Sequence, residues 1–371
     1  MSSLVAVTPI WHTHGNYNVY VASLTLASVD VSTSQDEGKT WSLNPATALP
    51  IDDRPWIAAT GASKVCISYL SAPGILLPQA GLHVQCSSDA GTTFTQLADA
   101  YDTSDTGTGC RTASRTGNLA FAPSNGGYLY QIAACQTIAD ASNPNPTANH
   151  VVVMAVSSDG GQTFTDHVVY ANPDPTVAYD NNFANVAVDR SGNIYAVYSD
   201  DHNVFYSFSA DHGNSWHGPY RVSEAGTNIY PWTPAGAGGK IDIVYYKTPY
   251  YDPVAGPGGY PNSAQWTVAV AQNLRATTVG SSFTRSTATP VIHLGGVCQG
   301  GVGCTGNRDL YDAFGIAASP TTGLASIIYS DDQYTTDPSN PPNPNCTAAT
   351  SNTGSCDHTA IATQTAGAVI K

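Results

Sequence analysis

The sequence predicts an all-β fold, a six-bladed β-propeller built from four-stranded antiparallel blades. Three observations lead to this prediction. Only two of the 371 residues are glutamate, whereas helical surfaces are usually rich in Glu and Lys. Short apolar or alternating runs recur between Gly, Asn, Asp and Pro clusters, as strands do between turns. A turn motif then repeats along the chain, which is typical of propellers.

The motif is S-x-D-x-G-x-[ST]-[FW], and it occurs at residues 34–41, 87–94, 157–164 and 209–216 without gaps. Its aspartate accepts backbone N–H groups across a tight turn, and its glycine supplies a positive φ. The hydroxyl residues add side-chain hydrogen bonds, and the final aromatic residue begins the next strand. We therefore predict hairpin turns with a structural aspartate in each, namely Asp36, Asp89, Asp159 and Asp211.

Further strands complete the repeat. The apolar runs at 266–271 and 358–363 lead to degenerate copies of the motif at 280–283 and 366–367, which brings the number of units to six. Pairs of short strands precede five of these units, within residues 56–69, 119–132, 183–198, 230–245 and 314–328. Each unit is then a four-stranded sheet, and residues 1–371 form one domain. The first blade is less regular, and the N-terminal strand has an alternative place in the last blade.

The eight cysteines lie in local pairs, which predicts the disulfides Cys66–Cys86, Cys110–Cys135, Cys298–Cys304 and Cys346–Cys356. An even number of cysteines in loop-rich sequence is typical of an oxidising compartment. A zinc site is the alternative for Cys298 and Cys304, but no second Cys/His pair has ligand spacing, so no metal is predicted. The disulfides favour a secreted protein. The sequence contains no signal peptide, and residues 1–3 resemble an added start, so we expect that a leader has been removed.

The charge excludes one class of partner. The net charge is −14 with only 13 Lys and Arg residues, whereas a nucleic-acid binder needs a basic surface. No apolar run has the length that spans a bilayer, so membrane insertion is not expected either. Acidic loops leave calcium binding open, and no other cofactor is predicted.

Loop lengths indicate which face of the propeller carries function. The turns between the first and second strands and the motif turns are short and lie on one face. The other face receives long loops, at residues 71–80, 136–149, 247–264 and 331–357, and long links between blades, at 45–53, 99–114, 172–181 and 286–307. Long loops on a rigid scaffold are where binding sites are usually built. The starts of the first strands surround the channel mouth on this face, and they carry Arg54, Arg115 and Arg308.

The repeat resembles the Asp boxes, or BNR repeats, of the sialidase superfamily. The segments DDRPWIA at 52–58, YPW at 230–232 and the stretch 298–312 are similar to secreted bacterial sialidase-like proteins. The resemblance implies that Arg54, Arg115 and Arg308 bind a sugar carboxylate. It also implies a tyrosine nucleophile, Tyr230 or Tyr311, and an acid, Asp53 or Asp312. If the propeller binds carbohydrate without cleaving it, we expect Trp11, Trp56, Trp232 and Tyr250 to be stacking platforms, and Trp56 and Trp232 to contact the substrate.

Three functions follow from these observations. The first is a glycoside hydrolase that acts on glycans or glycoconjugates at the channel mouth. The second is a non-catalytic propeller that binds carbohydrate or protein, and the third is a structural surface module. The arginines also have a structural interpretation, in which Asp53 with Arg54 and Asp309 with Arg308 form ion pairs that seal the channel.

Overall fold

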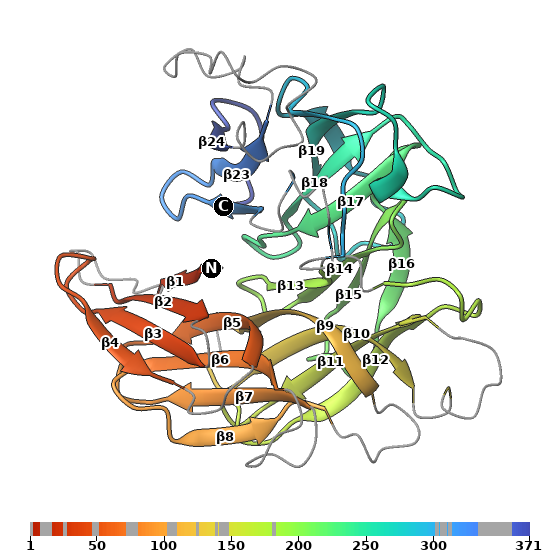
Figure 1. Cartoon of the computed structure of the whole chain (residues 1–371). Helices are drawn as coiled ribbons and strands as arrows, with labels where there is room; N and C mark the ends of the chain where they lie inside the picture. Colours follow the sequence, from red (N-terminus) through yellow and green to blue (C-terminus); the bar gives the residue numbers. More distant parts are fainter. Residues whose placement is uncertain are drawn as a thin grey trace. The chain divides into compact units, whose positions relative to one another are not determined.

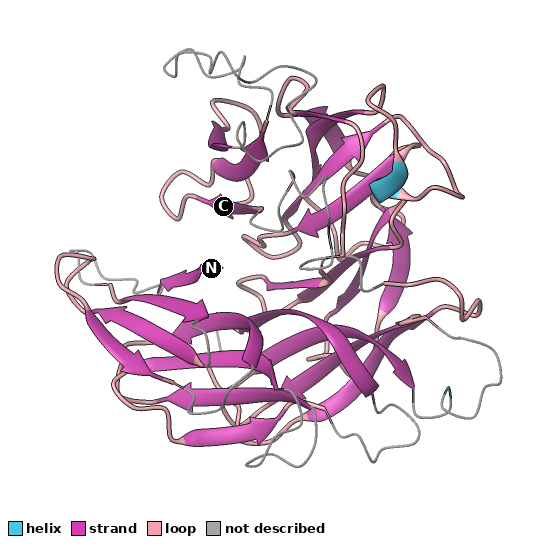
Figure 2. Cartoon of the chain, viewed as in Figure 1, coloured by secondary structure: helices cyan, strands magenta, loops and turns pink. Residues whose placement is uncertain are grey.

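The structure is a computed structural model, and it describes residues 3–7, 17–24, 28–46, 52–71, 81–101, 110–123, 126–137, 140, 148–179, 183–300, 304, 310, 314–332 and 358–371. Its strands form six antiparallel sheets that follow one another along the chain (Figure 1). Strands and loops dominate the described residues, with a short helix η2 at Pro257–Gly259 (Figure 2). The protein is thus an all-β, six-bladed β-propeller of mostly four-stranded sheets, as the sequence predicts.

The first three sheets belong to unit 1, which comprises Met1–Asp180 and Ala210–Trp216. Each sheet has four strands in chain order. The strands are β1 (Ser3–Val7), β2 (Val19–Leu24), β3 (Val29–Ser34), β4 (Ser42–Pro45), β5 (Asp52–Thr60), β6 (Lys64–Ser71), β7 (Gly81–Ser87), β8 (Gln96–Asp99), β9 (Cys110–Phe121), β10 (Leu129–Thr137), β11 (Val151–Ser157) and β12 (Thr165–Ala171). Because β1 pairs with β2, the N-terminal strand lies in the first sheet, and its alternative place in the last blade is wrong.

The other three sheets belong to unit 2, which comprises Asn181–Ser209 and His217–Lys371. The strands are β13 (Asn185–Val188), β14 (Ile194–Ser199), β15 (Val204–Ser209), β16 (His217–Arg221), β17 (Thr227–Trp232), β18 (Ile241–Thr248), β19 (Gln265–Asn273), β20 (Thr284–Thr287), β21 (His293–Leu294), β22 (Gly315–Ala318), β23 (Ala325–Asp331) and β24 (His358–Thr363). β21 pairs with β19 at the margin of the fifth sheet. In the described residues the sixth sheet has three strands, not the predicted four.

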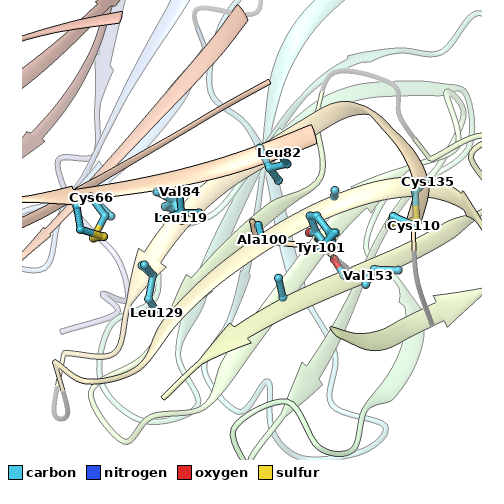
Figure 3. Close-up of a cluster of buried hydrophobic side chains, with 14 of the residues drawn as sticks. Cys66, Leu82, Val84, Ala100, Tyr101, Cys110, Leu119, Leu129, Cys135 and Val153 are labelled. Atoms are coloured by element: carbon cyan, nitrogen blue, oxygen red, sulfur yellow. Dashed lines mark hydrogen bonds between the residues drawn. A yellow bond between two sulfur atoms is a disulfide. The ribbon is translucent and has the colours of Figure 1, made fainter. Parts of the chain in front are cut away.

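The core of unit 1 forms where apolar strands face each other. All seven side chains of β11 are buried, because this strand is an almost continuous apolar run between two neighbouring strands. Figure 3 shows one cluster, in which Leu82 and Val84 of β7 lie with Leu119 of β9. Tyr101 is also buried here, and its hydroxyl donates to the Gln131 carbonyl oxygen at 2.9 Å, which satisfies the one polar group it brings into the core.

Three of the four predicted disulfides are confirmed, Cys66–Cys86, Cys110–Cys135 and Cys298–Cys304. Cys66 and Cys86 lie directly opposite each other on β6 and β7, with 4.1 Å between their Cα atoms. Cys346 and Cys356 lie outside the described residues. Three disulfides indicate an oxidising environment. None of the helices in the described part of the chain is long and apolar enough to cross a membrane.

The four motif turns share one hydrogen-bond pattern around their aspartate. Asp159 accepts the Ser157 hydroxyl at 2.7 Å, the Thr163 amide at 3.0 Å and the Thr163 hydroxyl at 2.6 Å. Asp36, Asp89 and Asp211 accept the corresponding groups four residues on. The two residues after each aspartate have positive φ, namely Glu37 (66°), Gly38 (86°), Ala90 (57°), Gly91 (78°), Gly160 (75°), Gly161 (90°), His212 (61°) and Gly213 (91°).

The motif turns also connect neighbouring sheets of unit 1. The Asn44 side chain of the first sheet donates to the Gly91 carbonyl oxygen of the second at 2.7 Å. The Gln96 side chain of the second sheet likewise donates to the Gly160 carbonyl oxygen of the third at 3.3 Å. A Cβ at Gly91 would lie 2.6 Å from the Thr33 hydroxyl, so glycine is needed there for close approach as well as for its φ. These contacts support a structural role for the aspartates.

The lowered pKa values of the motif aspartates lead to a prediction of how the stability of the protein depends on pH. The hydroxyl of Thr40 holds the pKa of Asp36 at about 2, and that of Ser87 holds the pKa of Asp89 at about 2, well below the usual range of an aspartate. A carboxyl whose folded pKa is lowered contributes stability above its unfolded pKa and loses it as the pH falls through the folded one. We therefore expect the melting temperature to fall steeply from about pH 4 to about pH 2.

Thermal melts across this range check the expectation, with Asp89→Asn as the comparison. The asparagine side chain no longer titrates, so the variant is expected to melt lower near neutral pH and to lose part of the wild-type slope. A variant with an unchanged slope would contradict the assignment of that slope to the motif turns.

Candidate functional site

The strand β5 is interrupted where the predicted site begins. Its register with β6 shifts between Asp53 and Trp56, and Arg54 in the shifted segment has a φ of 53°. Pro55 has no N–H for the ladder, so a bulge forms at this point. A left-handed φ at a residue that is not glycine costs about 1–2 kcal/mol and is concentrated at functional sites. Arg54 is half-buried, and the structure describes Asp53 by its backbone alone.

The strand β17 has the same interruption. Its register with β18 shifts between Ile229 and Trp232, and Tyr230 has a φ of 55°. Both bulges have the sequence x-Pro-Trp, and in both the strained residue directly precedes the proline. The first strands of the second and fifth sheets therefore share the same bulge before a Pro-Trp pair. The shared Pro-Trp pair was the sequence signal for it, but the left-handed residue before the proline was not predicted.

Trp56 connects β5 to the next sheet. Its side chain is 6% exposed, and its indole N–H donates to the Thr116 carbonyl oxygen of β9 at 3.0 Å. Thr116 directly follows Arg115, and Trp56 lies two residues beyond Arg54. The structure thus places Arg54 and Arg115 on neighbouring strands of unit 1, each next to this contact. The backbone of Arg115 lies opposite Ala134 of β10.

Tyr230 and Trp232 lie in unit 2. Tyr230 is 4% exposed, and its ring meets the ring of Tyr246 edge-on, with 6.0 Å between the centroids. Trp232 is half-buried, and its indole nitrogen would lie 3.8 Å from a Cβ built on Gly315 of β22. Tyr230 is therefore packed in the core of unit 2, and Trp232 lies against the next sheet.

Other predicted residues lie outside the described ranges. These are Trp11, Arg308, Asp309, Tyr311 and Asp312. The roles predicted for Arg308 and Asp312 stay predictions. Nor do the described residues place three or more His, Cys, Asp or Glu side chains where they could hold a metal ion.

A second polar cluster lies on the loops of unit 2. The Gln299 amide donates to Asp201 at 2.7 Å, and the Asn228 amide donates to the His202 carbonyl oxygen at 2.7 Å. These hydrogen bonds fix the orientation of both amide groups. The side-chain oxygens of Gln299 and Asn228 are buried, and no described residue donates a hydrogen bond to them. Burial lowers the pKa of His202, whose ring meets that of Tyr251 edge-on. Such acceptors suit water or a ligand hydroxyl.

Comparisons with solved structures find the same fold in proteins of low identity. A protein of unknown function from Dyadobacter fermentans DSM 18053 is 13% identical, with 88% of this chain and 89% of that chain covered and a TM-score of 0.52. The GH74 enzyme of Niastella koreensis is 15% identical, with 88% and 43% covered and a TM-score of 0.50. The NanB sialidase from Streptococcus pneumoniae is 10% identical, with 90% and 65% covered and a TM-score of 0.46.

No family model matches the sequence, and no curated protein matches it. At these identities the likeness is one of fold. The chain is structurally similar to a glycoside-hydrolase propeller and to a propeller of unknown function.

Proposed function

We propose that the protein is a secreted glycoside hydrolase that binds acidic glycans through Arg54 and Arg115. The observation that carries this proposal is the Trp56–Thr116 hydrogen bond, which brings the β5 and β9 segments with these arginines together. A guanidinium group recognises a carboxylate through two parallel hydrogen bonds. The strain at Arg54 adds support, because such strain is kept mainly where function needs it.

Hydrolysis needs an acid beside the bound sugar. In this proposal Asp53, the neighbour of Arg54, protonates the leaving oxygen. Tyr230, Asp312 and Arg308 keep the roles of nucleophile, alternative acid and third arginine as predictions. Trp56 then positions Arg54 and Arg115, because its indole N–H is already bonded to Thr116.

Binding without hydrolysis is the second candidate. A nucleophile has to reach the substrate, whereas Tyr230 is 4% exposed and packs on Tyr246. If Tyr230 serves only the core, the arginines bind an acidic glycan that the protein does not cleave. A substrate panel separates the two candidates, since both require Arg54 but only the hydrolase releases product.

We expect Arg54→Ala to weaken binding of a sialoside by about 10- to 100-fold, the usual worth of a charged hydrogen-bond pair. The melting temperature should change little, because arginine and alanine both have a Cβ and therefore bear the same strain at the positive φ of this position. Arg54→Lys should fall between wild type and alanine, since lysine keeps the charge but not the paired hydrogen bonds. Titration calorimetry with a sialoside, an assay on its fluorogenic form and a thermal melt measure these quantities.

Arg275→Ala is the matched control, because Arg275 is exposed and the substitution changes the net charge equally. A large loss of stability in Arg54→Ala with unchanged sialoside binding would show a structural ion pair instead. Fluorogenic neutral glycosides complete the panel, since cleavage that is independent of Arg54 would point to another substrate class.

A further inference from the structure

Among the described residues, the sixth sheet has one strand edge with which no other strand pairs. Its order is β22-β23-β24, while every other sheet has at least four strands. Within the described residues no strand pairs with the outer edge of β24, which lies beside β23 in Figure 1. Ile361 of this strand is 69% exposed. An unpaired edge presents backbone donors and acceptors to another extended chain.

The residues after β24 do not fill this place. The side-chain oxygen of Gln364 accepts a hydrogen bond from the Ala325 amide at 3.1 Å, and its side-chain nitrogen donates to the Ala368 carbonyl oxygen at 2.8 Å. The chain then turns toward the fifth sheet, where the Ala237 amide donates to the Ile370 carbonyl oxygen at 2.7 Å. The segment 364–371 therefore adds no fourth strand, and its residues Gln364, Ala366 and Ala368 instead line the cavity described next.

A cavity of about 310 Å³ lies beside the open edge, between the fifth and sixth sheets of unit 2. On one side it is lined by Val270 of β19 and by Thr284 and Ser286 of β20, and on the other by Ala362 of β24. All four residues of β20 are exposed. A fourth strand beside β24 would place side chains over this face, and the described residues supply none.

One wall of the cavity is a buried carboxylate. Asp242 of β18 is 1% exposed, and in the described residues its carboxylate accepts one hydrogen bond, from the Gln272 amide at 2.8 Å. A buried carboxylate normally accepts several, because ionised groups are costly to bury with few partners. Burial raises the pKa of Asp242. Among the described residues its hydrogen-bond partner is the neutral Gln272 amide, and no Lys or Arg side chain pairs with it. A cation that enters the cavity would supply a compensating positive charge.

We propose that the edge of β24 accepts an extended peptide of a basic partner protein, with a lysine or arginine side chain that reaches Asp242. The peptide backbone pairs with β24, and alternate side chains enter the cavity, as in strand addition to other sheet edges. The net charge of −14 favours a basic partner and disfavours a second copy of this chain. This site is separate from the residues of the proposed hydrolase function.

The probe is a fluorescent octapeptide that alternates valine and threonine and carries one central lysine. We expect it to bind, and the same peptide with glutamine for lysine to bind about tenfold more weakly. Asp242→Asn should abolish that difference, since asparagine still accepts the Gln272 amide but carries no charge. Fluorescence anisotropy measures affinity, and slowed hydrogen exchange of the amides in 358–363 locates the peptide.

A pair of variants on β20 keeps the test independent of the buried position. Ser286 lines the cavity, and its exposed neighbour Thr287 points to the opposite face of the strand. We expect Ser286→Trp to block the peptide and Thr287→Trp to leave its affinity unchanged. The proposal is overturned if neither peptide binds, if both bind equally well, or if the two tryptophan variants bind alike.

Discussion

Gly226→Ala is expected to lower the free energy of unfolding by about 3–4 kcal/mol. Gly226 has a φ of 111°, which strains any residue with a Cβ. The new Cβ would also lie 2.2 Å from the Thr248 carbonyl oxygen and 3.0 Å from the Pro249 Cα. Both are backbone atoms, in the last residue of β18 and in the residue that follows it, so no side chain can move aside. Relief requires that β17 and β18 separate at this end.

Urea denaturation followed by tryptophan fluorescence measures this loss. Gly280→Ala is the control, because Gly280 has a φ of 78° but no atom within 4 Å of a Cβ. It should cost only about 1 kcal/mol, the usual cost of replacing a left-handed glycine. Equal losses in the two variants would mean that the backbone at Gly226 yields without resistance.

Removal of the Cys66–Cys86 disulfide is expected to cost about 3 kcal/mol, because the bond closes a 20-residue separation in the unfolded chain. Both cysteines are at most 1% exposed, so the double alanine variant also loses packing. A Cβ on Gly161 would lie 3.0 Å from the Cys86 sulfur, which shows how closely the third sheet's motif turn packs on it.

The Cys298–Cys304 disulfide provides the comparison. It spans a separation of six residues, and Cys298 is half-buried. Its double alanine variant should lose about 2 kcal/mol, since a shorter loop loses less entropy on closure. Urea titration of both variants gives the difference. A larger loss at Cys298–Cys304 would contradict the loop-length argument and assign the stability to local contacts of its loop.

The motif turns and the three described disulfides were predictable because their determinants are local. Asp159 finds its partners within four residues, and Cys66 meets Cys86 across one hairpin. The bulge at Arg54 was not predictable in the same way. A residue before proline prefers extended φ and ψ, yet Arg54 has a φ of 53°. The contact of Trp56 with Thr116, 60 residues away in sequence, accompanies that conformation.

The last sheet shows the limit of a repeat-based prediction. The degenerate motif at 366–367 predicted a turn into a fourth strand, but it lacks the aspartate that accepts the hydrogen bonds of the other turns. Long-range contacts then decide the path, and Ile370 bonds to Ala237 instead. The site residues depend even more on such packing. Sequence spacing selected Arg54 and Arg115 as strand starts, which is wrong for Arg115, because β9 begins at Cys110 and Arg115 lies inside it. Only the structure shows the tryptophan between their strands.

The hydrogen bonds from Asn44 and Gln96 to the motif turns of the following sheets determine how unit 1 comes apart. If the first sheet detaches, the Gly91 carbonyl oxygen loses its donor, and detachment of the second does the same to Gly160. Each sheet therefore gains stability from its neighbour, as in a chain of coupled repeats. A form with one sheet detached has lost the hydrogen bond to its neighbour and exposes the interface between the two sheets. This loss makes unfolding of unit 1 cooperative.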